Sequence, residues 1–90
     1  MKTPSENIRK LHRLLRSKPL EWTPHVLTRL QAGERVLRTE DEIVALLRTV
    51  PKKIVWGTLI ELSYRTKYNL FTIVIKPTPE SLRIVTFMEE

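Results

Sequence analysis

The 90-residue sequence contains no cysteine, only two glycines and no apolar run near the ~20 residues of a membrane span. Without cysteine there are no disulfides, no thiolate nucleophile and no Cys-based zinc site. With so little glycine there is no glycine-rich phosphate loop, and metal-binding histidine pairs, EF-hand loops and serine elbows are also missing. The sole aspartate, Asp41, lies between Glu40 and Glu42 in the first turn of a predicted helix. We therefore expect no metal and no cofactor.

The remaining composition is that of one small globular domain. Hydrophobic residues make up 41% of the chain and charged residues 29%, and a chain of this length holds a single core. The first residues lack a continuous apolar segment, so we expect a cytoplasmic protein with no membrane contact. Sixteen Lys and Arg against ten Asp and Glu give a formal net charge of +6. Such an excess attracts polyanions through counterion release, so nucleic acid is the expected partner class.

Three helices are predicted in the first half of the chain. The Thr3-Pro4-Ser5-Glu6 start and an apolar stripe that includes Leu11 predict a basic amphipathic helix within residues 1–18. Thr23-Pro24 repeats the cap-plus-proline signal, and Gly33 is a C-terminal cap signal, so a second helix is predicted over about 23–32. A capping box at Thr39 and a stop at Pro51 predict a third over about 40–49.

The second half of the chain has the texture of β-strands. Short runs rich in β-branched and aromatic residues predict strands over residues 53–56, 58–65, 70–76 and 81–87. The connections at 65–69 and 77–80 are too short for parallel crossovers, so neighbouring strands pair as antiparallel hairpins. We therefore expect an α+β domain, residues 1–90, with three N-terminal helices on one face of a three- to four-stranded antiparallel sheet. Residues 1–18 form its basic helix and 22–88 its α+β core.

His25 is the most interesting titratable residue in the sequence. It lies in the first turn of the second predicted helix, where the positive end of the helix dipole favours anions. Arg29 follows at i+4, so one helical face presents an imidazole and a guanidinium together. The alternative interpretation is an ordinary polar helix start. His12, within the basic helix, is interpreted as a surface or boundary residue.

Cations and aromatic residues supply a candidate nucleic-acid surface. Arg9, Arg13 and Arg16 recur on one side of the first helix, and Lys52-Lys53 add two more positive charges. Tyr64, Arg65, Lys67 and Tyr68 cluster around a predicted hairpin turn, where they could neutralise phosphates and stack on bases. The alternative is a solvated turn with edge tyrosines. Thr86 places a hydroxyl in the last predicted strand.

Together these segments resemble a known group of proteins. Trp22-Thr23-Pro24-His25 through Arg29, the capped helix from Thr39 to Arg48, and the final Ile84-Val85-Thr86-Phe87 resemble the barnase/EndoU/colicin/RelE-like small ribonuclease toxins. The likeness covers about residues 22–88. It implies a metal-independent site that acts on RNA. By resemblance, His25 corresponds to the helical histidine, Arg29 to its companion cation, Arg65 or Lys67 to the sheet cation, and Thr86 to the last-strand hydroxyl.

Two functions from different classes remain open at this point. The first is a metal-independent endoribonuclease in which His25 is the base, the cations stabilise the phosphorane, and Thr86 or Tyr68 positions the phosphate. The second is a non-catalytic phage or plasmid regulator that binds nucleic acid or a host protein through its basic helix. RNA is expected rather than DNA. An acidic protein partner such as an antitoxin also fits the positive surface, and an edge strand leaves a homo-oligomer open.

Overall fold

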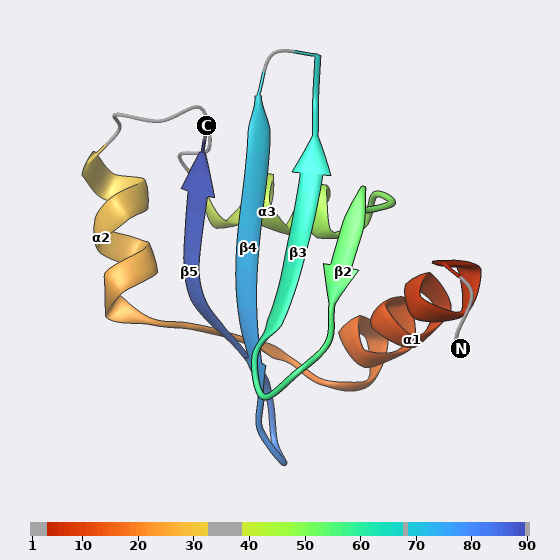
Figure 1. Cartoon of the computed structure of the whole chain (residues 1–90). Coiled ribbons are helices and arrows are strands. Elements are labelled where there is room, and N and C mark those ends of the chain that lie inside the picture. Colours follow the sequence, from red (N-terminus) through yellow and green to blue (C-terminus); the bar gives the residue numbers. More distant parts are fainter. Residues whose placement is uncertain (1–3, 33–38, 68, 90) are drawn as a thin grey trace.

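The computed structural model describes residues 4–32, 39–67 and 69–89 (Figure 1). Within them lie three helices and five strands, which confirms the α+β class. The helices are α1 (Pro4–Ser17), α2 (Pro24–Ala32) and α3 (Glu40–Leu47). The strands are β1 (Leu20–Trp22), β2 (Lys53–Val55), β3 (Ile60–Arg65), β4 (Leu70–Pro77) and β5 (Leu82–Glu89). The caps assigned to Thr3 and Gly33 fall outside the described residues.

The sheet corrects two details of the expected architecture. Its strand order is β1-β5-β4-β3-β2, and β1 pairs with β5 in parallel while the other pairs are antiparallel. The sheet is therefore five-stranded and mixed, not antiparallel with three or four strands, and the helices are not all N-terminal to the strands. The sequence analysis missed β1 because three residues that follow Lys18-Pro19 are too short for an alternation pattern. Its partner β5 is also about 60 positions away, so no local turn signal marks the pairing.

The core lies between the helices and one face of the sheet, here called the inner face. Pairing partners share a face, and the inner side chains of β3, β4 and β5 are buried, among them Phe71, Ile73 and Ile75, which alternate along β4. Each helix adds buried residues to this cluster. In Figure 1, α3 crosses behind the strands, α2 flanks β5 and α1 lies beside β2. The buried cluster comprises Leu11, Val26, Leu30, Ile43, Leu47, Ile60, Leu62, Tyr64, Phe71, Ile73, Ile75, Leu82, Ile84 and Phe87.

A β-bulge in β5 sets which side chains of that strand face the core. Ile75 pairs with Ile84 but Val74 pairs with Thr86, so Val85 is the extra residue. The bulge shifts the alternation by one position, and both Ile84 and Phe87 are fully buried on the inner face. Thr86 consequently shares the opposite face, here called the outer face, with its partner Val74. Outer-face residues of the neighbouring strands include Glu61, Ser63 and Arg65.

The helix starts are fixed by specific hydrogen bonds. The predicted capping box of α3 is confirmed: Glu42 N donates to Thr39 Oγ1 over 3.2 Å, and Thr39 N donates to Glu42 Oε1 over 3.1 Å. Thr23 lies directly before α2, as predicted, and its carbonyl oxygen accepts from Leu27 N over 3.1 Å, but its hydroxyl donates to the carbonyl oxygen of Ile84 over 2.9 Å. This bond attaches the entrance of α2 to β5 at the bulge.

Helix α1 packs with its apolar stripe against the rest of the domain. Leu11 is 1% exposed, and Lys10 Nζ lies 4.4 Å from the centroid of the Trp56 ring, just after β2. The cation–π contact and the buried leucine together place this basic helix beside β2. None of the helices in the described ranges is long and apolar enough to cross a bilayer.

Candidate active site

The candidate site forms where the first turn of α2 meets β5. His25 Nε2 and Thr86 Oγ1 are 3.3 Å apart, which is hydrogen-bonding distance, and the tautomer of the imidazole decides which atom donates. His25 is exposed and Thr86 is half-buried, so the pair remains open to a ligand. Two residues separated by 61 positions, each selected from the sequence, therefore meet in the structure.

Arg29 lies one turn farther along α2 and touches the other face of the same strand. Its guanidinium carbon is 5.6 Å from the centroid of the Phe87 ring, a cation–π distance. The Nε atom of Arg29 is buried and has no hydrogen-bond partner among the described residues. Helix α2 thus straddles the edge of β5, with His25 against outer-face Thr86 and Arg29 against inner-face Phe87. The bulge at Val85 makes this possible, because it gives adjacent Thr86 and Phe87 the required orientations.

The electrostatics at this end of α2 favour an anion. No acidic residue lies in the first turn of α2, so the positive end of its dipole is not neutralised within the helix. An unpaired Arg29 donor adds to this field. Arg83, another cation on β5, is already paired, because its Nε contacts Glu21 Oε2 over 2.8 Å across the β1–β5 pair. That hydrogen bond lowers the pKa of Glu21 below its ordinary value.

Arg65 and Lys67, the predicted sheet cations, are not brought to this pair. Arg65 faces the same outer face as Thr86, but β4 separates their strands and Arg65 lies four positions beyond Glu61, the residue level with Thr86. That amounts to about 10 Å across the sheet and about 13 Å along it, more than one phosphate group bridges. Lys67 lies still farther along, in the β3–β4 turn. Neither Arg65 nor Lys67 therefore lies beside His25, where the resemblance implies a cation from the sheet.

The two tyrosines predicted to stack on bases, Tyr64 and Tyr68, have different outcomes. Tyr64 is 2% exposed and belongs to the core, so its assignment as a nucleic-acid contact is wrong. The register with Phe71 turns the Tyr64 side chain to the inner face, so it does not join the cations of the predicted hairpin turn. Burial raises the pKa of its phenol well above the ordinary value, and its hydroxyl has no partner in the described part of the chain. Tyr68 lies outside the described residues.

The basic residues predicted to contact nucleic acid are accessible. Arg9, Arg13 and Arg16 are exposed on α1, and Lys52 and Lys53 are exposed at the start of β2. Because α1 lies beside β2, these five cations occupy the side of the domain opposite α2 (Figure 1). They therefore form a surface separate from the His25–Thr86 pair.

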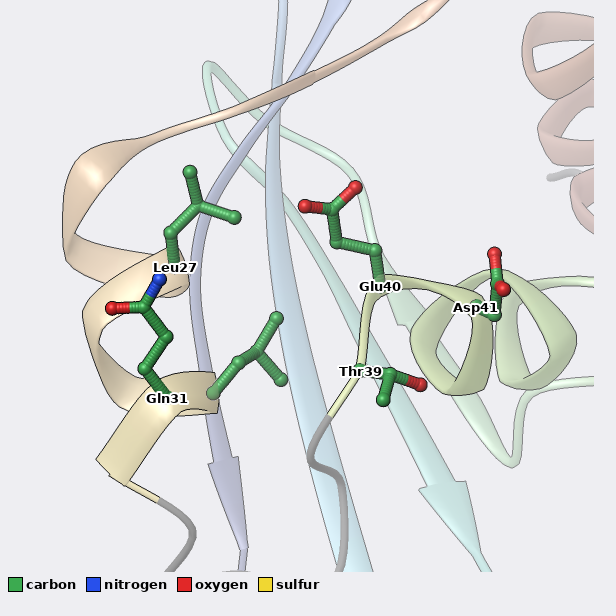
Figure 2. A pocket seen from close by; sticks show the side chains of 6 residues that line it. Leu27, Gln31, Thr39, Glu40 and Asp41 are labelled. Atoms are coloured by element: carbon green, nitrogen blue, oxygen red, sulfur yellow. The ribbon is translucent and has the colours of Figure 1, made fainter.

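A pocket between α2 and α3 is also separate from the candidate site. Figure 2 shows the elements that border it: Leu27 and Gln31 are on α2, and Thr39, Glu40 and Asp41 are at the start of α3. Leu27 follows His25 by two positions, which is about 200° around the helix. The pocket thus lies on the side of α2 away from His25. Its carboxylates repel the kind of anion that the candidate site favours.

Two functional features escaped the sequence analysis. One is the bulge at Val85, whose sequence signal is the spacing of apolar residues at 82, 84 and 87, two positions and then three. The other is Arg48, which caps α3 and lines a cleft with His12 and Arg16 of α1. Nothing local marks that juxtaposition. Among the described residues, no three His, Cys, Asp or Glu side chains form a group that could hold a metal ion.

Comparison with known proteins adds no relative to this picture. No family model, curated protein or solved structure matches the chain. The functional argument therefore depends on the site itself.

Proposed function

We propose that this protein is a metal-independent endoribonuclease whose reaction centre is His25, Arg29 and Thr86. The observation that carries the proposal is the 3.3 Å approach of His25 Nε2 to Thr86 Oγ1 at an exposed, anion-favouring helix start. Arg29 supplies a half-buried guanidinium one turn farther along α2, in contact with the Phe87 ring. An imidazole, a cation and a hydroxyl at one edge are a sufficient set for phosphodiester transesterification.

The reaction uses the nucleophile that RNA itself carries. His25 removes the proton from a 2′-hydroxyl, the 2′-oxygen attacks the adjacent phosphorus, and the bond from phosphorus to the 5′-oxygen breaks. Solvent supplies the proton that the departing 5′-oxygen takes up, and the imidazolium later returns its proton to solvent. The products are a 2′,3′-cyclic phosphate and a 5′-hydroxyl. A base in this position contributes about 10²- to 10⁴-fold to the rate.

The other two residues act on the phosphate. Arg29 stabilises the extra negative charge of the phosphorane, and its contact with the Phe87 ring holds the guanidinium near β5 before substrate arrives. Thr86 accepts or donates a hydrogen bond to the imidazole and so orients the ring. Its hydroxyl also lies where it can donate to a phosphate oxygen once His25 turns to the 2′-hydroxyl.

The test is cleavage of a single-stranded RNA in excess chelator, followed by analysis of the new ends. We expect a 2′,3′-cyclic phosphate, no cleavage of the same sequence carrying 2′-O-methyl groups, and a large loss of rate in Arg29→Gln. Thr28→Val, an exposed change in the same helix, is the matched control. Cleavage of the 2′-O-methyl strand, or activity that disappears in chelator, would contradict the proposal.

A second candidate function is nucleic-acid binding without cleavage. The observation in its favour is the exposed row of Arg9, Arg13 and Arg16 on α1, which needs no reactive group to bind phosphates. In the same experiment, salt-dependent retardation of RNA with no new ends would support this function over the first.

A further inference from the structure

A cleft between α1 and α3 brings three basic groups together on the side of the domain away from His25. It has a volume of about 320 Å³ and is lined by His12, Leu15 and Arg16 of α1 and by Arg48 of α3. This is the lower end of the size range of ligand pockets, enough for a phosphate and its sugar. Leu15 provides the apolar wall, and the remaining lining is cationic or titratable.

The charge in this cleft is not balanced by its own walls. No carboxylate belongs to its described lining, and neither guanidinium has an ion-pair partner in the described part of the chain. Two positive side chains from different helices therefore share one cavity without a counter-charge. Both guanidiniums are exposed, so an anion that enters the cleft can accept hydrogen bonds from the two side chains.

The imidazole of His12 also belongs to the wall of this cleft. Its Nε2 atom is buried and has no hydrogen-bond partner among the described residues. Because this atom is closed off from solvent, an anion in the cleft contacts Arg16 and Arg48, whose guanidiniums each offer several donors to its oxygens. We propose that this cleft binds a backbone phosphate of RNA, remote from the bond that is cut.

A polynucleotide fits the surroundings better than a single free phosphate. Arg16 is the end of the row Arg9, Arg13, Arg16, which runs about 10 Å along α1. A ligand with repeated phosphates can occupy the cleft and follow this row, whereas a free phosphate fills the cleft alone. The inference depends on RNA being the ligand of the proposed function, but it does not depend on cleavage.

Binding of a 2′-O-methyl oligonucleotide tests the inference without cleavage, because this strand lacks the attacking hydroxyl. Affinity is measured across a salt series for the wild type, Arg48→Gln and the double variant Arg16→Gln/Arg48→Gln. We expect about threefold weaker binding for the single variant, about tenfold for the double, and a salt slope lower by about 1 per lost contact. Lys76→Gln is the charge-matched control, because Lys76 is exposed on the outer face.

The outcomes separate this inference from the proposed function. Equal effects of Arg48→Gln and Lys76→Gln would overturn it, because net charge alone would then explain the binding. Saturable binding of inorganic phosphate at the His12 ring, with no added affinity for the oligonucleotide, would also overturn it, as would equal competition by polyglutamate. Loss of affinity confined to the cleft variants supports it even if the wild type cleaves nothing.

Discussion

The hydroxyl of Thr23 donates a hydrogen bond to the carbonyl oxygen of Ile84 over 2.9 Å, so the entrance of α2 is attached to β5 beside the bulge. Two residues later on α2 comes His25, and two residues later on β5 comes Thr86. One hydrogen bond between remote segments thus sets the position of the imidazole relative to the hydroxyl.

Thr23→Val removes this bond while keeping the β-branched shape. We expect the free energy of unfolding to fall by about 1 kcal/mol, the usual contribution of one hydrogen bond. The rate of RNA cleavage should fall by more than the decrease in the folded fraction explains, because His25 is no longer fixed against Thr86. Urea unfolding and cleavage rates under folded conditions measure the two effects. Thr28→Val should change neither, and a Thr23→Val protein of normal activity would contradict the positioning role.

Phe87→Leu tests the platform beneath Arg29. The substitution reshapes a fully buried site and should cost about 1 to 1.5 kcal/mol of stability. Phe71→Leu makes the same change at a buried position on the neighbouring strand, where no arginine of the described residues contacts the ring. Both variants should lose similar stability, but only Phe87→Leu should slow cleavage at saturating RNA. Equal rates in the two variants would show that the ring does not position Arg29.

Tyr64→Phe tests the buried phenol. Its hydroxyl has no partner among the described residues, so its removal should leave stability unchanged or raise it by up to about 1 kcal/mol. Burial raises the pKa of Tyr64, so the unfolded state loses the phenolic proton first as pH rises. Wild-type stability should therefore fall above the ordinary tyrosine pKa of about 10, and Tyr64→Phe should remove that part of the decline. Unfolding curves at neutral and alkaline pH compare the two proteins.

Glu21→Gln tests the ion pair across β1 and β5. The hydrogen bond from Arg83 lowers the pKa of Glu21, so the native state binds its proton less readily than the unfolded state. The stabilisation is present above the ordinary glutamate pKa and is lost as pH falls through the lowered value. We expect a small difference in stability between wild type and Glu21→Gln at neutral pH, since the pair is exposed, and we expect this difference to disappear as the pH falls. A difference that grows on acidification would contradict this sign.

Local signals predicted most of the secondary structure. The capping box at Thr39 and the alternation of Phe71, Ile73 and Ile75 lead to the observed α3 and β4 because both effects operate within a few residues. The parallel β1 escaped detection because its pairing is made with a strand about 60 positions away. Short segments carry too little pattern to reveal such a partner.

The candidate site was predictable only in part. His25, Arg29 and Thr86 were selected from residue type and position, and the structure brings His25 to Thr86. The sequence could not show that Tyr64 faces inward or that Arg65 lies four positions beyond the level of Thr86, because both depend on strand register. The level and face of Thr86 depend in turn on the bulge at Val85, where one extra residue exchanges the two faces of β5.

The central claim is that the imidazole of His25 removes the proton from a 2′-hydroxyl of RNA. The most direct measurement compares single-turnover cleavage of one RNA by the wild type and by His25→Gln, in excess chelator and at equal ionic strength. We expect the wild type to release a 2′,3′-cyclic phosphate and the variant, folded to the same stability, to be at least about 100-fold slower. Equal rates in the two proteins, or no cleavage by the folded wild type, would contradict the claim.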